Sequence, residues 1–163
     1  NPRPKVVIVI QTHVDILIPS DRDAAFALMS DLDQFPTFFT GFGPIPKVVR
    51  CELVSPLPVA VGSKRLISNG DGSVLEEIVE IHEDGKEQRY RIEKGFVPPF
   101  SFLIAAAVGH WTFESEAQGT RVGWTYRFEL TSSLARPIAG FIVHVFFKRA
   151  MMRCLGNMRQ ALS

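Results

Sequence analysis

The chain has 163 residues, 46% of them hydrophobic, and its charged side chains nearly cancel to a formal net charge of +1 at pH 7. This size and composition predict one globular domain over residues 1–163, with residues 1–5 as a short tail. The basic residues are scattered among acidic ones and form no stripe, which argues against binding to nucleic acid. The two cysteines cannot build a disulfide framework, so we expect a reducing, cytoplasmic compartment.

Residues 6–18 predict the first strand, because they are rich in β-branched side chains and alternate in polarity. Pro19 ends this strand, and Ser20 or Asp21 is a suitable cap for a helix that follows. A second short helical turn is predicted at residues 33–39, before an irregular loop with several phenylalanines.

Further strands follow in close succession, each ended by turn residues such as Gly, Pro, Asn and Asp. Strands joined by such short turns must be antiparallel. The last strand alternates most clearly, since every second residue from Val122 to Leu130 is apolar. The predicted strands cover residues 47–54, 62–68, 73–82, 86–94, 102–116 and 121–130.

The chain closes with one long predicted helix at residues 133–162. Wound at about 100° per residue, this helix has an apolar stripe that we expect to face the sheet. Residues 138–147 are apolar on nearly every side, so the back of this half must be covered or form a contact surface, for a membrane or for a second copy in a homodimer. The predicted stripe consists of Leu134, Ile138, Phe141, Val145, Met152 and Leu155, and Met151, Met158 and Leu162 extend it toward the C-terminus.

The order of these elements predicts an α+β fold, in which a curved antiparallel sheet of about seven strands wraps around the terminal helix. Several segments have a familiar sequence: residues 18–26, 31–36 (Asp-Leu-Asp-Gln-Phe-Pro), 61–64, 76–80 and 119–124. Together with the terminal helix, they resemble the START and birch-pollen-allergen (SRPBCC) superfamily with the helix-grip fold, and within it the polyketide cyclase/dehydrase and lipid-transport branch. The resemblance extends from Val14 to Leu162.

This resemblance implies a deep cavity between the concave face of the sheet and the terminal helix. Different members of the superfamily use the cavity to carry lipids, quinones, polyketides or hormones, and a minority catalyse cyclisation or dehydration. None of the shared segments is a catalytic signature, so the resemblance informs the fold more than the chemistry. It implies a hydrophobic small-molecule ligand and no cofactor.

The alternation of the strands predicts which side chains line such a cavity. Small residues from Ala105 to Gly109 leave space that a close-packed interior would fill, which favours a real cavity. We predict a lining of Tyr90, Ala105, Ala107, Trp111, Trp124, Tyr126, Phe141, Val145 and Met152. Aromatic loops should form its entrance through Phe38, Phe39, Phe42, Phe96 and Phe100.

Three charged residues, Arg65, Glu77 and Lys148, interrupt the apolar pattern of the predicted interior. A lone buried charge costs several kcal/mol, so these residues must pair, shift their pKa or reach water. They are the candidate catalytic residues, as an acid/base pair or as a polar spot that orients a ligand; the alternative is a structural ion pair with a lysine that extends to solvent. The four histidines lack the spacing of metal ligands, and no metal site is predicted.

Three functions remain open at this stage. The first is a carrier or sensor that holds a hydrophobic small molecule. The second is a cyclase or dehydratase that uses Glu77 and Lys148 for proton transfer. The third is a protein-interaction module that uses the apolar half of the terminal helix.

Overall fold

A seven-stranded antiparallel sheet forms the frame of the protein in a computed structural model that describes residues 2–3 and 6–163. The strand order is β1-β7-β6-β5-β4-β3-β2, so the first and last strands lie side by side. Part of the predicted tail at residues 1–5 lies outside the described residues. The strands are β1 (Val9–Ile18), β2 (Val48–Leu53), β3 (Lys64–Asn69), β4 (Val74–Glu83), β5 (Glu87–Lys94), β6 (Ile104–Glu116) and β7 (Gly119–Leu130).

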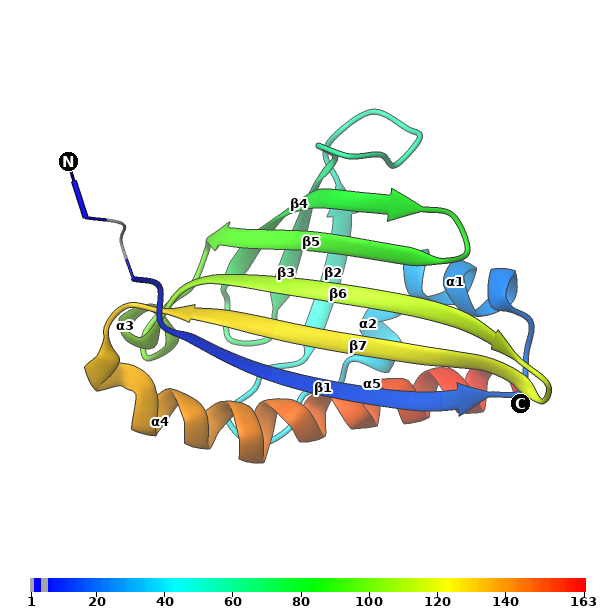
Figure 1. The fold of residues 1–163 in the computed structure, drawn as a ribbon. Coiled ribbons are helices and arrows are strands. Elements are labelled where there is room, and N and C mark those ends of the chain that lie inside the picture. Colours follow the sequence, from blue (N-terminus) through cyan, green and yellow to red (C-terminus); the bar gives the residue numbers. More distant parts are fainter. Residues whose placement is uncertain (1, 4–5) are drawn as a thin grey trace.

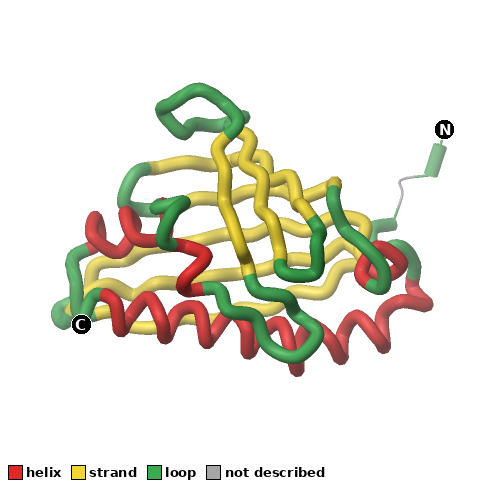
Figure 2. The backbone as a smooth tube through the Cα atoms, turned by 180° about the vertical axis from the view of Figure 1, so that it is seen from behind, coloured by secondary structure: helices red, strands yellow, loops and turns green. Residues whose placement is uncertain are grey.

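One long helical run at the C-terminus lies along one side of the sheet (Figure 1). Figure 2 shows the same arrangement from behind, with β2 and β3 running steeply across the direction of β6 and β7, so that the sheet is strongly curved. Three shorter helices complete the fold, and Asp21 caps the first by accepting a 2.7 Å hydrogen bond from the amide of Ala24. These helices are α1 (Arg22–Ser30), α2 (Phe35–Phe38) and α3 (Phe100–Leu103).

The predicted α+β helix-grip arrangement is therefore confirmed, with small errors at the ends of elements. The first strand begins at Val9 and not at residue 6. The strand predicted from residue 102 begins at Ile104, because α3 occupies the positions before it.

The terminal helical run changes its winding along its length. It begins as a 3-10 turn and passes through a π-helical segment, whose i→i+5 hydrogen bonds place more residues in each turn than an α-helix does. Its parts are η1 (Ser133–Ala135), α4 (Arg136–Phe141), η2 (Ile142–Phe147) and α5 (Lys148–Ala161).

The prediction of which helix face meets the sheet is wrong for most of the stripe. Leu134, Ile138, Phe141 and Met152 are exposed, and Val145 and Leu162 are half-buried. Only Met151, Leu155 and Met158, all in the second half of the run, are buried as expected. The first half of the run is apolar all round, so its periodicity cannot decide between two faces. Small residues decide it, since the face toward the sheet carries Ala135, Ala139 and Val143.

Two bulges change which strand residues point inward. Ala105 is an extra residue in β6, where the pairing with β7 shifts between Ile104 and Ala106, and its side chain is exposed. The prediction that Ala105 lines the cavity is therefore wrong. Val49 in β2 is exposed for the same reason, because the register with β3 shifts around it.

Candidate ligand-binding cavity

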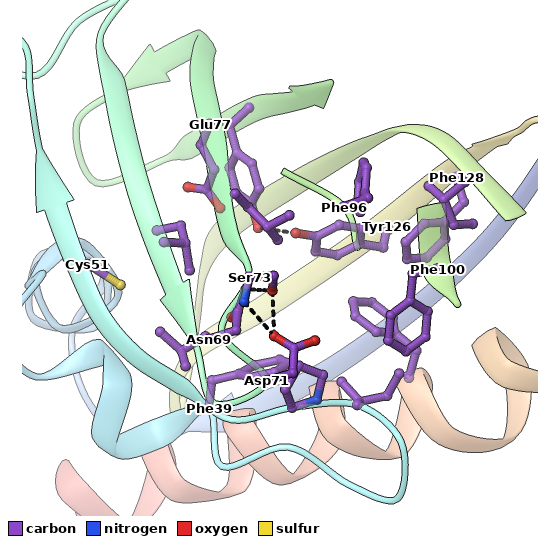
Figure 3. A pocket seen from close by; sticks show the side chains of 18 of the residues that line it. Phe39, Cys51, Asn69, Asp71, Ser73, Glu77, Phe96, Phe100, Tyr126 and Phe128 are labelled. Atoms are coloured by element: carbon purple, nitrogen blue, oxygen red, sulfur yellow. Dashed lines mark hydrogen bonds between the residues drawn. The ribbon is translucent and has the colours of Figure 1, made fainter. Parts of the chain in front are cut away.

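A cavity of about 170 Å³ lies between the curved sheet and the first half of the terminal helical run. Because roughly 10–15 Å³ of such volume is enough for one water molecule, this space is far larger than a packing defect. Phe147 closes it on the helix side, with Ala139, Ile142 and Val143. Figure 3 shows side chains that line the cavity, among them Tyr126 and Phe128 on the sheet. Phe100, which belongs to α3, also lines it.

The wall formed by β6 and β7 is aromatic, as the alternation of β7 predicted. Trp111 and Trp124 stack with ring centroids 4.0 Å apart. Tyr126 stacks on Phe128 at 5.3 Å, and the ring of Phe147 meets Tyr126 edge-on at 4.8 Å. These rings hold one another in place, so the wall is preformed.

Gly109 makes room for a pair of tyrosines on this wall. In the sheet it lies directly between Tyr90 and Tyr126. A Cβ at this position would overlap the ring and hydroxyl of Tyr90. Because Gly109 has no Cβ, the Tyr90 side chain can lie over it and donate a 3.0 Å hydrogen bond from its hydroxyl to the Tyr126 hydroxyl.

A buried polar cluster forms another part of the lining. Arg65 and Glu77 are paired across β3 and β4, and Nη2 of Arg65 lies 2.9 Å from Oε1 of Glu77. Nη1 of the same arginine donates a 2.8 Å hydrogen bond to Oε1 of Gln88, whose amide nitrogen donates to Nδ1 of His82 at 3.2 Å. The guanidinium also lies over the ring of Tyr90, 5.2 Å from its centroid.

Burial changes the acid–base properties of this cluster. Desolvation raises the pKa of Glu77 above its ordinary value, and the nearby Arg65 only partly opposes this. Desolvation also raises the pKa of the hydroxyls of Tyr90 and Tyr126, and it raises the pKa of Cys51 to about 12. The cavity therefore offers neutral hydroxyl groups, a neutral thiol and a carboxyl group that holds its proton more tightly than usual.

A second polar group lies where the turn between β3 and β4 borders the cavity (Figure 3). There Asp71 accepts hydrogen bonds from the amide and the hydroxyl of Ser73, at 2.9 and 2.6 Å, and Asn69 donates to the same hydroxyl at 3.1 Å. These residues and Gln88 were not predicted from the sequence. Gln88 could have been found, because it shares the inward alternation of Tyr90 and Ile92.

The structure brings together many of the residues singled out in the sequence. The polar candidates Arg65 and Glu77 both line the cavity. The aromatic residues on the predicted list that also line it are Tyr90, Trp111, Trp124, Tyr126, Phe39, Phe96 and Phe100.

Other predicted residues lie elsewhere. Lys148 is exposed on the outer side of the terminal helical run, so it cannot pair with Glu77 in the cavity. It was misplaced because the helix face predicted to meet the sheet, on which it lies, points outward at this position. Phe141 and Met152 point outward for the same reason, and Val145 and Ala107 are not part of the lining. Two of the phenylalanines assigned to the entrance pack elsewhere: Phe38 is buried away from the cavity, and Phe42 contacts Phe146 at 6.1 Å between centroids.

Two other kinds of site are missing from the described part of the chain. Within residues 2–3 and 6–163, no three His, Cys, Asp or Glu side chains are grouped so that they could hold a metal ion. Over the same residues, no helix combines the length and the apolar character needed to cross a membrane.

The sequence matches a known protein family. The profile of a family described as polyketide cyclase/dehydrase and lipid transport matches residues 9–163, which is almost the whole chain. No curated protein matches the chain by sequence.

Solved structures with the same fold have low sequence identity to this chain. The major latex-like protein 151 of Panax ginseng has a TM-score of 0.70 at 12% identity, covering 96% of this chain and 99% of its own. The protein TTHA0849 of Thermus thermophilus has a TM-score of 0.70 at 17% identity, over 94% of this chain and 97% of its own. The di-domain ARO/CYC StfQ of the steffimycin biosynthetic pathway has a TM-score of 0.72 at 17% identity, over 95% of this chain but 51% of its own.

Proposed function

We propose that the protein is a small-molecule binder, because the chain belongs to the polyketide cyclase/dehydrase and lipid-transport family and contains a cavity suited to such a ligand. The protein binds a hydrophobic small molecule in the cavity between the sheet and the terminal helical run, as a carrier or sensor. The cavity itself carries this proposal, because it is preformed, mostly apolar and bordered by a few convergent polar groups, as small-molecule sites usually are.

The polar cluster narrows the class of ligand. Two donors near it, Nε of Arg65 and Nε1 of Trp124, are buried without an acceptor in the described part of the protein. The Tyr126 hydroxyl accepts from Tyr90 and keeps its own proton available. We therefore expect an elongated or polycyclic apolar molecule with an oxygen at one end, such as a fatty acid, a quinone or an aromatic polyketide.

Tryptophan emission tests this proposal directly, because Trp111 and Trp124 both line the cavity. Titration with a long-chain fatty acid, a naphthoquinone and an anthraquinone should quench or shift the emission for at least one class, with saturation at one molecule per chain. Native mass spectrometry of protein purified from its own host should show a bound mass of the same class. A flat titration for all three, together with only the mass of the bare chain, would contradict the proposal.

A matched pair of variants identifies the site. Ala139 is buried and faces the cavity, whereas its neighbour Ile138 is exposed. Ala139→Phe should therefore fill the space and weaken binding at least tenfold, while Ile138→Phe adds similar bulk outside and should leave binding unchanged. If Ala139→Phe does not fold, Ile67→Phe on the opposite wall replaces it.

A second candidate function is proton-transfer catalysis, and Glu77 is the observation that favours it. A buried carboxyl with a raised pKa beside an apolar cavity is suited to act as an acid or base. StfQ, named as an ARO/CYC, shares the fold. If the protein is a cyclase or dehydratase, Glu77→Gln should abolish turnover and leave ligand binding within a few-fold; turnover that survives this change would exclude the role.

A further inference from the structure

The outer face of the terminal helical run carries large apolar side chains that the described protein leaves mostly exposed. Leu134 is 86% exposed, Ile138 58% and Phe141 59%. Phe102 of α3 is 70% exposed, and its carbonyl accepts a 2.7 Å hydrogen bond from Thr131, just before this run begins. Because α3 contacts α4, these side chains lie on neighbouring elements. Several large exposed apolar side chains on adjoining elements indicate an interaction site.

The charges on the same segment all have one sign. Residues 130–163 contain Arg136, Lys148, Arg149, Arg153 and Arg159 and no Asp or Glu, a formal charge of +5. The whole chain has 18 basic and 17 acidic residues, so residues 1–129 hold 13 and 17 and carry −4. The net charge is therefore positive on the segment that also exposes the apolar side chains and negative on the rest of the chain.

These cations are not neutralised within the described part of the chain. The ion pairs among residues 2–3 and 6–163 involve other side chains, mostly on the sheet. Arg149 and Arg153 instead lie over the ring of Phe42, at 5.5 and 5.1 Å from its centroid. Nη1 of Arg153 also donates a 3.4 Å hydrogen bond to the carbonyl of Gly41. All five side chains are exposed, so an anionic surface can reach them.

We infer that this outer face, defined by Phe102, Leu134, Ile138, Phe141 and the five cations, docks on a lipid surface that contains anionic headgroups. A helix with apolar and basic side chains on one face lies in the plane of such a surface, with the apolar groups in the headgroup region and the cations against the lipid charges. A symmetric dimer through the same face is disfavoured, because it would bring the five cations of one copy against the five cations of the other.

The docked face lies directly outside the cavity wall. In α4 and η2, Ile138 and Phe141 point outward while Ala139, Ile142 and Val143 line the cavity. In α3, Phe102 points outward while Phe100 and Leu103 line it. If the proposed ligand binding is right, docking would bring the lipid phase within one helix diameter of the ligand.

Vesicle flotation tests the inference. Vesicles of equal parts phosphatidylcholine and phosphatidylserine should bind the protein, vesicles of phosphatidylcholine alone should bind it far less, and added salt should weaken the binding. Lys148→Gln/Arg149→Gln should reduce partition roughly 25-fold, since each cation near an anionic surface contributes about fivefold. Leu134→Ser/Phe141→Ser should reduce it about tenfold or more.

The control is Val49→Ser/Arg50→Gln on β2, an exposed apolar and basic pair away from this face, which should leave partition unchanged. Absence of binding to the anionic vesicles, or equal loss in the control, would overturn the inference. A dimer in solution that Phe141→Ser dissociates would also overturn the inference, because the outer face would then bind a second copy of the chain and not a lipid surface. Ligand titration without vesicles should be the same in all three variants, so failure of the cavity proposal and failure of this one are separable.

Discussion

The two ends of the space between sheet and helix are filled in different ways. Where α5 packs along β1 near α1, the interior is solid: Ile18, Val122, Met151, Leu155 and Met158 are completely buried. Where η2 and α4 face the rest of the sheet, the same two layers enclose the cavity, with lining residues from β2 to β7. One helical run therefore serves as core at one end and as the wall of a binding site at the other.

This difference shows how the protein tolerates an empty interior. Unfilled volume removes contacts from the side chains around it and costs stability. The solid end supplies compensating burial, and the aromatic and hydrogen-bonded pairs of the wall keep the cavity from collapsing. Substitutions at the solid end should therefore affect folding first, whereas those at the hollow end should affect binding first.

The largest expected effect is that of Leu155→Ala at the solid end. Because Leu155 is completely buried, the free energy of unfolding should fall by about 2–5 kcal/mol. Ile142→Ala is the matched change at the hollow end, where the side chain already borders empty space, and it should cost about half as much. Urea denaturation followed by circular dichroism measures both, and equal losses would contradict the division into two ends.

Gly109→Ala should have the next largest effect. The added Cβ overlaps Tyr90, so the tyrosine must move into the cavity and give up its bond to Tyr126; overpacking of this kind costs about 1–3 kcal/mol. Gly156 in α5 is the control, since nothing lies within 4 Å of a Cβ there. Gly156→Ala should stabilise the protein by roughly 0.5–1 kcal/mol, whereas Gly109→Ala should lower both stability and ligand affinity.

The same contrast explains how far the sequence could predict this structure. The strands and the concave face of β7 follow from alternation, because every second residue there is apolar. The terminal helix was found from its apolar content, but its orientation was not. Leu134 and Phe141 look like core residues, and only packing shows that the smaller Ala135 and Ala139 face the sheet.

The cavity was only partly predictable for similar reasons. Arg65 and Glu77 stood out because charges interrupted an apolar pattern, and cross-strand register brings them together. Ala105 was misplaced because one inserted residue in β6 reverses the direction of a side chain, and nothing in the local sequence marks that bulge.

The pH dependence of stability should distinguish wild type from Glu77→Gln. Burial raises the pKa of Glu77 above 4.5, so between that value and its native pKa the folded protein binds more protons than the unfolded chain. The contribution of Glu77 is thus fully present below the unfolded pKa and is lost as pH rises, with a slope of at most about 1.4 kcal/mol per pH unit. Denaturation at a series of pH values should show wild type losing stability relative to the variant; a relative gain would mean that the pairing with Arg65 outweighs burial.

The smallest expected effect is that of Phe141→Ala on the outer face of α4. Had this side chain belonged to the buried stripe predicted from the sequence, its removal would cost about 3–5 kcal/mol. Because it is mostly exposed, its loss should change the free energy of unfolding by no more than about 0.5 kcal/mol in buffer. Denaturation of the two proteins side by side decides between these values. A near-zero result means that folding does not account for a large aromatic side chain at this position, which is what the proposed docking of this face on anionic lipid requires.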